Sequence, residues 1–356
     1  MNRRAHDGAV ARVRANGSLG QRAVLAASLW VAASLALAVG TLWWQARQVG
    51  GVWALSLPLL APSVGFALVS AGLRTLRWHA FLGAVGARPP IKTSMHAWLV
   101  GFSMTMTPGK VGEIYKCHLI EQRTGVPMAR TAPIVLFEKG MDAIAFALLA
   151  LTAAAMLPGL ADSISASART LIGVGIAGAF AVFLLHRARP DDVATVVLRA
   201  VGRFRLGRRM ASWAVMALAG SLDLLRPALL TRSMALSLAA RTCDGMCLAW
   251  AVWALGIQLP ALAGVFALNS SGAIGGLSML PGGIGIVETS ITLLLTRFGV
   301  TAAAALAGTL IARFLTFWMW VAAGLILLIA SIDLRGADPW PGSTDPTPPS
   351  PGRRTG

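Results

Sequence analysis

The chain has 356 residues, of which 56% are apolar and only 13% are charged. Soluble domains carry about a quarter charged residues, so this composition argues against a water-soluble enzyme or a disordered chain and indicates a polytopic membrane protein. In a soluble protein the net charge of +17 would suggest nucleic-acid binding. In a membrane protein it must first be compared with the topology, because cytoplasmic loops collect Lys and Arg.

The N-terminal segment 1–22 is basic, and the apolar run that follows it (23–44) is long enough to span a bilayer. No clear small-residue cleavage site follows the run, so we predict an uncleaved first helix. The three cysteines form no disulfide framework. Cys243 and Cys247 lie one helical turn apart without further ligands nearby, so we predict no metal site and no cofactor.

A transmembrane span needs about 20 largely apolar residues. Two apolar stretches, 94–122 and 262–297, are instead interrupted near their middle by Pro and Gly. Broken helices in lipid must be buried in protein or line a polar cavity, so we predict two re-entrant hairpins, each entering and leaving on one side. The predicted fold is therefore all-α, with these two hairpins and about six full spans, at 23–44, 52–73, 131–156, 166–186, 233–256 and 302–332.

The distribution of basic residues tests this topology. With the N-terminus in the cytoplasm, 23 of the 31 Lys and Arg residues fall in inside segments, three fall outside and five lie within apolar segments. This asymmetry predicts a multi-pass membrane protein with both termini in the cytoplasm. It also removes the argument for nucleic-acid binding.

Two inside segments are distinctive. Residues 187–232 are predicted to form a basic loop with an amphipathic helix on the inner leaflet, because apolar residues at 193, 197, 200, 201 and 204 share one helix face. If 210–230 spanned the membrane instead, everything after it would change sides. The tail, 333–356, is rich in proline and is predicted to be disordered. A single transmembrane domain, 23–332, lies between the two termini.

The two interruptions look alike. Both 108–112 and 281–285 have the pattern Pro-Gly-x-(Val/Ile)-Gly, and a carboxylate follows each of them. Each pattern lies at the same place in a unit of span, hairpin and span, and the two units cover 52–156 and 233–332. The charge-derived topology makes these units inverted. Inverted repeats with interrupted helices are typical of transporters, with the substrate site where the interruptions meet.

On these residues the chain resembles the lysylphosphatidylglycerol synthase transmembrane (flippase-like) family. The matching pieces are Arg77-Trp78, residues 107–113, Glu138 with Asp142, and residues 280–288. The resemblance implies a membrane region that moves an aminoacylated phospholipid, with other members associated with polyprenyl-linked sugars or hopanoids. The chain has Lys116 where the family pattern has Arg, and it has no counterpart of the aminoacyl-transferase domain.

Ionisable residues within apolar segments are the candidate functional residues, since a charge at the bilayer centre costs roughly 2.5–3.5 kcal/mol. Glu138 and Asp142 share a helix face and need a cation between them, which Lys110, Lys116 or Arg313 would supply. Half-helices after each Pro-Gly pair would point backbone N–H groups at a phosphate. The predicted headgroup-binding residues are Pro108, Gly109, Lys110, Gly112, Glu113, Lys116, Glu138, Asp142, Pro281, Gly282, Gly283, Gly285, Glu288 and Arg313.

A structural interpretation stands beside this one, in which the same charges form interhelical ion pairs or extend to the interface. We assign Arg241 and Asp244 to that structural class, and interface placement is an alternative for Glu138 and Lys139.

Two functions follow as hypotheses. The first is a lipid translocase for an anionic or aminoacylated phospholipid, or for a polyprenyl- or hopanoid-type lipid, working without a nucleotide-binding loop. The alternative is an integral-membrane enzyme, or an accessory subunit with a lipid-synthesis enzyme as its partner, whose carboxylates would do acid–base work.

Overall fold

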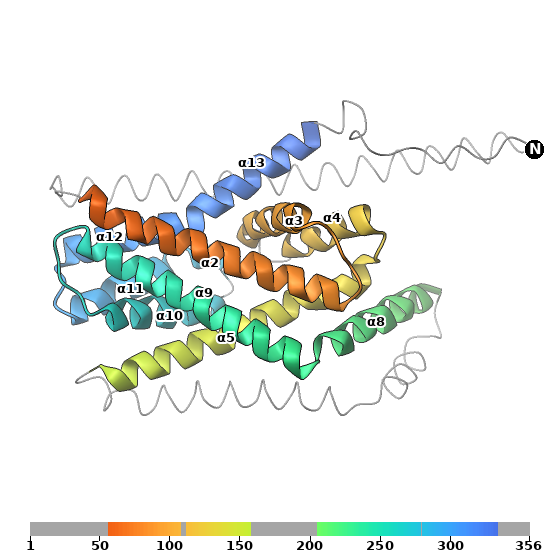
Figure 1. The fold of residues 1–356 in the computed structure, drawn as a ribbon, viewed down its shortest axis with the longest axis horizontal. Helices are drawn as coiled ribbons and strands as arrows, with labels where there is room; N and C mark the ends of the chain where they lie inside the picture. Colours follow the sequence, from red (N-terminus) through yellow and green to blue (C-terminus); the bar gives the residue numbers. More distant parts are fainter. Residues whose placement is uncertain (1–55, 108–111, 158–204, 279, 334–356) are drawn as a thin grey trace, which may run out of the picture.

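The structure, a computed structural model, describes residues 56–107, 112–157, 205–278 and 280–333. All regular elements within these ranges are helices (Figure 1), which confirms the all-α prediction for the described part of the chain. The predicted spans at 23–44 and 166–186, the amphipathic helix near 193–204, the basic N-terminus and the Pro-rich tail lie outside the described residues.

The first unit contains α2 (Leu57–Ala84), α3 (Ile91–Ser103), α4 (Tyr115–Thr124) and α5 (Met128–Met156). A short 3₁₀ helix, η1 (Met104–Met106), follows α3 directly. Prolines precede α3 and α5 as their N-cap residues, where the missing N–H costs nothing. The apolar stretch 94–122, for which an interruption was predicted, therefore contains two separate helices, α3 and α4, and η1 follows the first of them.

The second unit contains α9 (Pro227–Trp253), α10 (Ala261–Leu277), α11 (Ile286–Arg297) and α12 (Ala302–Arg313). The 3₁₀ helix η3 (Pro281–Gly283) lies between α10 and α11, as η1 lies between α3 and α4. After α12 the chain passes through a π-helical turn, η4 (Phe314–Trp318), into α13 (Met319–Asp333). The elements of the two units therefore occur in the same order.

The two units are arranged in opposite directions. In Figure 1, α2 runs from left to right and α9 runs beside it from right to left. The packing between the units is reciprocal, because α5 lies against α10 and α13 lies against α3. The pairs α5 with α13 and α10 with α3 occupy equivalent places, which is the arrangement expected of an inverted repeat.

Glycines allow several of these helices to approach closely. A Cβ on Gly245 of α9 would lie 2.4 Å from the Cα of Val265 on α10. A Cβ on Gly324 of α13 would lie 2.0 Å from the carbonyl oxygen of Leu99 on α3. Close contact through small residues is the usual way in which helices pack in a bilayer.

Two described helices, Leu57–Ala84 and Ala302–Ser331, are long and apolar enough to cross a membrane. The first of them differs from the predicted span at 52–73, because α2 continues to Ala84. Segment 74–84 was expected to be a cytoplasmic loop on account of its arginines. It stays helical because Arg74 and Arg77 are only 7% and 3% exposed and have carboxylate partners on other helices.

The predicted cytoplasmic loop 187–232 is also more regular than expected in its second half. Residues 205–224 form a helix, α8, which packs against α5. Asp223 near its end accepts a hydrogen bond of 2.8 Å from Arg130. Figure 1 shows α8 at the right-hand end of the molecule, beside the start of α9.

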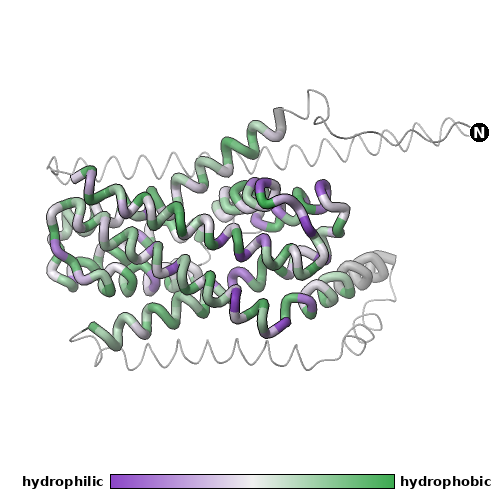
Figure 2. The backbone as a smooth tube through the Cα atoms, in the orientation of Figure 1, coloured by the Kyte–Doolittle hydropathy of each residue, from purple (hydrophilic) through white to green (hydrophobic). Residues whose placement is uncertain are grey.

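Hydrophilic residues are unevenly placed along the long axis. Figure 2 shows them gathered toward the end where α2 finishes and α9 begins, and in the middle of the long helices. The loops and helix ends at that end carry Arg88, Lys92, Arg123 and Arg226, whereas those at the other end of the described molecule carry Arg297. The described residues thus show the same charge asymmetry that the sequence indicates.

A buried chain of charges beside two helix interruptions

Seven charged side chains form a continuous chain of ion pairs in the interior. Each pairs with the next, and positive and negative groups alternate from one end to the other. In order, the chain of charges runs Arg74, Asp244, Arg241, Asp142, Arg77, Glu138 and Lys116. It joins α2, α4, α5 and α9, so it draws on both units. It begins and ends with a cation, and therefore has four positive and three negative groups.

The centre of the chain of charges is Asp142, which binds two arginines from two other helices. Arg77 of α2 donates to one carboxylate oxygen at 2.7 Å, and Arg241 of α9 donates to the other at 2.6 Å. Glu138, one turn earlier on α5, lies 3.8 Å from Arg77. The two carboxylates thus share a face of α5, as their spacing predicts, and Arg77 is the cation between them.

One end of the chain of charges lies near the first interruption. Lys116 of α4 forms an ion pair with Glu138, and its ammonium lies 4.3 Å from the centre of the Trp78 ring. The Lys116 side chain runs along Gly101 of α3, where a Cβ would come within 2.8 Å of it. The predicted pairing of Lys116 with an α5 carboxylate is therefore present.

The other end lies where α2 crosses α9. Asp244 forms an ion pair with Arg74 and accepts a hydrogen bond of 2.6 Å from Ser70. Asp244 also lies 3.3 Å from Arg241, and both residues form ion pairs with other helices, as their assignment to the structural class expects. That pair is part of the larger chain of charges.

Arg74 and Arg77 are the residues that sequence reasoning placed wrongly, since it assigned both to a loop outside the membrane. A signal was present: Ser70, Arg74 and Arg77 have the spacing of one helix face, and all three contact acceptors on α9. A helix end that is assigned from hydropathy alone misses such a face. A few buried charges lower the mean hydropathy even where the helix continues and is enclosed by protein.

The second interruption has its own ion pair. Arg313, the last residue of α12, donates to Glu288 of α11 at 2.7 Å and to the carbonyl oxygen of Gly282 at 3.0 Å. Its guanidinium lies 4.4 Å from the centre of the Phe317 ring. Arg313 therefore does not lie between Glu138 and Asp142, which is one of the places considered for it.

Glu288 also organises the backbone of its hairpin. Its second oxygen accepts a hydrogen bond of 2.8 Å from the N–H of Gly285, which closes the start of α11. Gly282, Gly283 and Gly285 all have positive φ, between 60° and 79°. Glycine is needed here because other residues pay a steric cost in this conformation, so the pattern after Pro281 encodes the turn.

At the first interruption, Pro108, Gly109 and Lys110 lie outside the described residues. The described part begins again at Gly112, whose N–H donates to the Thr107 hydroxyl at 2.8 Å. Glu113 follows and lies 2.6 Å from the ammonium of Lys139 on α5. Lys139 had been given no functional role from the sequence, yet it is the partner of a predicted site residue.

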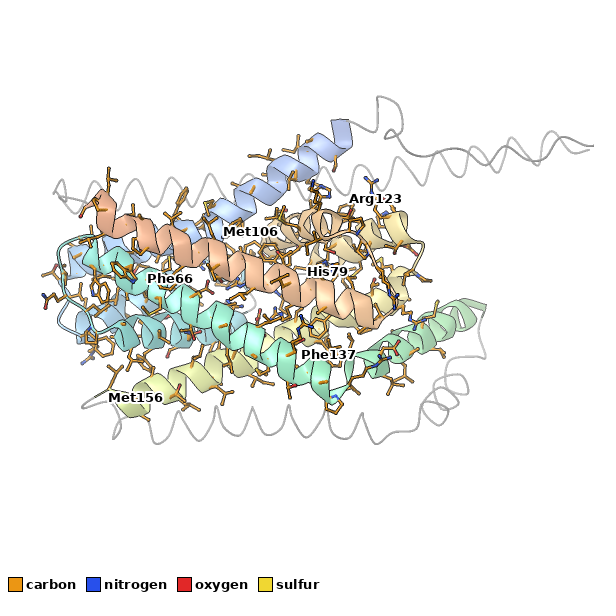
Figure 3. The ribbon with its side chains drawn as sticks, in the orientation of Figure 1. Phe66, His79, Met106, Arg123, Phe137 and Met156 are labelled. Carbon is orange, nitrogen blue, oxygen red and sulfur yellow. The ribbon has the colours of Figure 1, made fainter. Side chains whose placement is uncertain are left out.

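The two interruptions contact each other. η1 lies against η3, and a Cβ on Gly282 would lie 2.8 Å from the Met106 sulfur and from a carbon of the Phe317 ring. Figure 3 places Met106 in the middle of the molecule. Met106 packs with Trp318, Val321 and Leu325 in an apolar cluster. The segment just before the first Pro-Gly break thus contacts the second break, while Pro108 and Gly109 themselves lie outside the described residues.

Several buried polar atoms of this region have no hydrogen-bond partner among the described residues, and they include Arg77 Nε, Glu138 Oε1 and Trp78 Nε1. Unsatisfied buried groups are costly, and each can be explained by a ligand or water that completes it. No group of three potential metal ligands occurs in the part of the chain that the structure describes.

A separate pocket of about 380 Å³ lies at the basic end of the molecule. It is formed by the loop between α2 and α3 together with the end of α4, and Figure 3 shows Arg123 at that end. Arg88, Arg123 and Thr93 are among its lining residues. The pocket therefore offers positive charge where the first hairpin opens.

Comparison with known proteins identifies a family. The family model described as the lysylphosphatidylglycerol synthase TM region matches residues 31–324. The match covers the first repeat unit, the second up to residue 324, and all residues of the buried chain of charges and of the two hairpin ion pairs. Among curated proteins, none matches this chain.

Proposed function

The chain belongs to the family of lysylphosphatidylglycerol synthase TM regions, and from this premise we propose that it is a lipid translocase of the flippase or scramblase kind. The family is a transmembrane domain of lipid-related function, so the protein is a membrane protein. The proposal adds that a lipid headgroup crosses the bilayer beside the two Pro-Gly breaks while the acyl chains remain in lipid.

The observation that carries the proposal is the buried chain of charges that begins and ends with a cation. Seven ionised groups inside a helical membrane domain are expensive, and such groups are by default functional. A structural role alone would be served by balanced pairs, whereas this chain has one positive charge more than its carboxylates neutralise. An anionic group that enters the site would restore neutrality.

A phosphate is the anion that fits these donors. Lys116 pairs with one oxygen of Glu138 and Arg77 lies near the other, and Arg77 Nε and Trp78 Nε1 are buried N–H groups without a partner among the described residues. Guanidinium and ammonium groups bind phosphate oxygens strongly in a medium of low dielectric constant. We therefore propose a phospholipid or another lipid with a phosphate headgroup as the substrate.

The proposed location is the bacterial inner membrane, with the basic end of the molecule in the cytoplasm. Arg88, Lys92, Arg123 and Arg226 lie at that end, and cytoplasmic loops carry an excess of such residues. The basic pocket there would attract anionic headgroups of the inner leaflet, which has a negative surface potential.

The test uses purified full-length protein in liposomes that contain phosphatidylglycerol with a fluorescent acyl chain. A membrane-impermeant reductant bleaches the outer leaflet, and translocation exposes the remaining fluorescence over time. We expect the protein to increase the bleached fraction, and Lys116→Gln to slow the bleaching at least about tenfold, because about 1.4 kcal/mol of lost headgroup binding has that effect.

The matched control is Arg226→Gln, a substitution at an exposed residue of the basic end that keeps the wild-type rate. Equal bleaching with and without protein would reject the translocase proposal. Mass spectrometry of the recovered lipid separates the alternative function, because an enzyme would change the lipid covalently whereas a translocase only moves it.

A further inference from the structure

Each repeat unit contains an ion pair in which the hairpin supplies the acid and the helix that follows supplies the cation. In the first unit, which also has the reverse pair Lys116–Glu138, Lys139 of α5 lies 2.6 Å from Glu113, two residues before the second half-helix α4. In the second unit, Arg313 of α12 lies 2.7 Å from Glu288 in the first turn of α11. The same two elements supply the same two charges in both units.

The positions of the cations also correspond. Lys139 is the twelfth residue of α5, which starts at Met128, and Arg313 is the twelfth residue of α12, which starts at Ala302. At 1.5 Å per residue, each cation lies roughly 17 Å along its helix, about half the thickness of a bilayer core. Because the units are inverted, the two helices start from opposite ends of the molecule.

The two pairs flank the contact between the interruptions. Arg313 binds the carbonyl oxygen of Gly282, and Gly282 packs against Met106 of the first hairpin. Glu113 follows Gly112, which is tied to Thr107 one residue beyond η1. An apolar contact between Met106, Gly282 and Phe317 therefore lies between the two ion pairs.

Taking the proposed function as its premise, we propose that Lys139–Glu113 and Arg313–Glu288 are two symmetry-related headgroup sites, each loaded from one leaflet. A phosphate entering from the basic end displaces Glu113 from Lys139. A phosphate entering from the opposite end displaces Glu288 from Arg313. The headgroup passes between the two sites when Met106 and Phe317 move away from Gly282.

The chemistry of both pairs suits such an exchange. A cation that leaves a carboxylate for a phosphate keeps its charge balanced throughout, so it is never buried alone. Glu288 retains the N–H of Gly285 as a donor after Arg313 departs. The side chain of Lys139 is 44% exposed and that of Arg313 is 10% exposed, so the cation of the first site is the more accessible of the two.

Photolabelling from one leaflet at a time tests the proposal. The probe is a short-chain phosphatidylglycerol with a photoreactive diazirine on its headgroup, added from outside to proteoliposomes sorted by the orientation of a C-terminal tag. Illumination immediately after addition on ice limits the lipid to one leaflet, and mass spectrometry identifies the labelled peptides. We expect α4 and α5 peptides to be labelled from the basic end, and α11 and α12 peptides from the other end.

Two substitutions then separate the sites. Lys139→Gln should lower labelling from the basic end about tenfold and leave labelling from the other end unchanged, and Arg313→Gln should do the reverse. Because Arg313 is buried, the variant Arg313→Lys is included to keep the positive charge and the fold. Its labelling from the end opposite the basic end should lie between that of wild type and that of Arg313→Gln. Thermal unfolding in detergent shows whether each variant is folded.

The outcomes distinguish this inference from the proposed function. Labelling of the same peptides from both leaflets, or an equal loss in both variants from both sides, would mean a single shared site and would overturn the two-site proposal. Wild-type protein that translocates fluorescent lipid without labelling of these peptides would also overturn it while leaving the translocase intact. If the protein moves no lipid in the fluorescence assay, the proposed function itself is rejected, whatever the labelling shows.

Discussion

The two interrupted hairpins have the same plan and different surroundings. Lys139 at the first hairpin has one carboxylate partner and a side chain that is 44% exposed. Arg313 at the second hairpin binds Glu288 and the carbonyl oxygen of Gly282, lies over the Phe317 ring and is 10% exposed. Equivalent positions in the two repeats thus hold cations of very different exposure.

The two halves also differ in the charges beside these pairs. Next to Lys139, α5 carries Glu138 and Asp142, which join the buried chain of charges. At the corresponding places the second unit has Ala312 and Thr316, with no carboxylate. The ion pairs at the hairpins are therefore shared by both repeats, whereas the α5 carboxylates of the buried chain of charges have no counterpart in the second unit.

The backbone differs at the same place. The chain after Arg313 forms a π-helical turn at Phe314–Trp318, whereas α5 continues as a regular helix past Lys139. π-Helical turns are frequent at functional sites, because the wider turn leaves the regular hydrogen-bond ladder. Here the turn brings Phe317 against the guanidinium of Arg313 and against Gly282.

The largest effect on the free energy of unfolding is expected at Asp142, one of the α5 carboxylates that have no counterpart in the second repeat. Asp142→Asn removes the shared partner of Arg77 and Arg241 and leaves two buried guanidinium groups with only longer contacts to acids. The free energy of unfolding should fall by about 3–5 kcal/mol. Thermal unfolding in detergent micelles measures this. Asp223→Asn, at a partly exposed pair with Arg130, is the control and should cost less than about 1 kcal/mol.

A direct comparison of the hairpins comes from the two glutamates. Glu288→Gln leaves Arg313 enclosed with neutral carbonyl acceptors and no carboxylate, and the free energy of unfolding should fall by about 2 kcal/mol. Glu113→Gln frees Lys139, which is exposed enough to be solvated, so its effect should stay below about 1 kcal/mol. Equal losses in the two variants would show that the difference in exposure has no energetic weight.

A smaller effect is expected where the hairpins meet. Gly282→Ala places a Cβ at φ 60° and 2.8 Å from the Met106 sulfur, so the free energy of unfolding should fall by about 1–2 kcal/mol. Lipid movement should slow as well if this contact must open. Gly276→Ala, where no atom lies within 4 Å of the added Cβ, is the matched control and should leave unfolding and transport unchanged.

Much of the architecture could be predicted from the pattern of apolar residues. The interrupted hairpins at 94–122 and 262–297 correspond to α3 with α4 and α10 with α11, and the Pro-Gly patterns mark the breaks. Hydropathy was sufficient there because lipid excludes unpaired backbone groups, so an interruption within an apolar stretch has few solutions. It failed at α2, where buried arginines were mistaken for the end of a span.

The candidate site was predicted only in part, because the sequence shows spacing within a helix and not contacts between helices. The i,i+4 spacing of Glu138 and Asp142 required a nearby cation, but spacing within one helix does not reveal which residue of another helix provides it. Arg77 fills that place, Arg313 lies with Glu288, and Lys139 pairs with Glu113. These partners are separated by 25 to 65 residues in the chain, so no local pattern connects them.

The sequence by itself determined that this is a helical membrane protein with two related, interrupted units. Composition, hydropathy and the location of glycine and proline are local properties, and the bilayer restricts what they can form. Only the tertiary structure decided how the charges combine. The crossing of α2 with α9 and the seating of each hairpin against the helix that follows it convert scattered basic and acidic residues into one continuous chain of ion pairs and two matched pairs at the breaks. The reason is that the free energy of a buried charge depends on its partner, and the partner is chosen by packing.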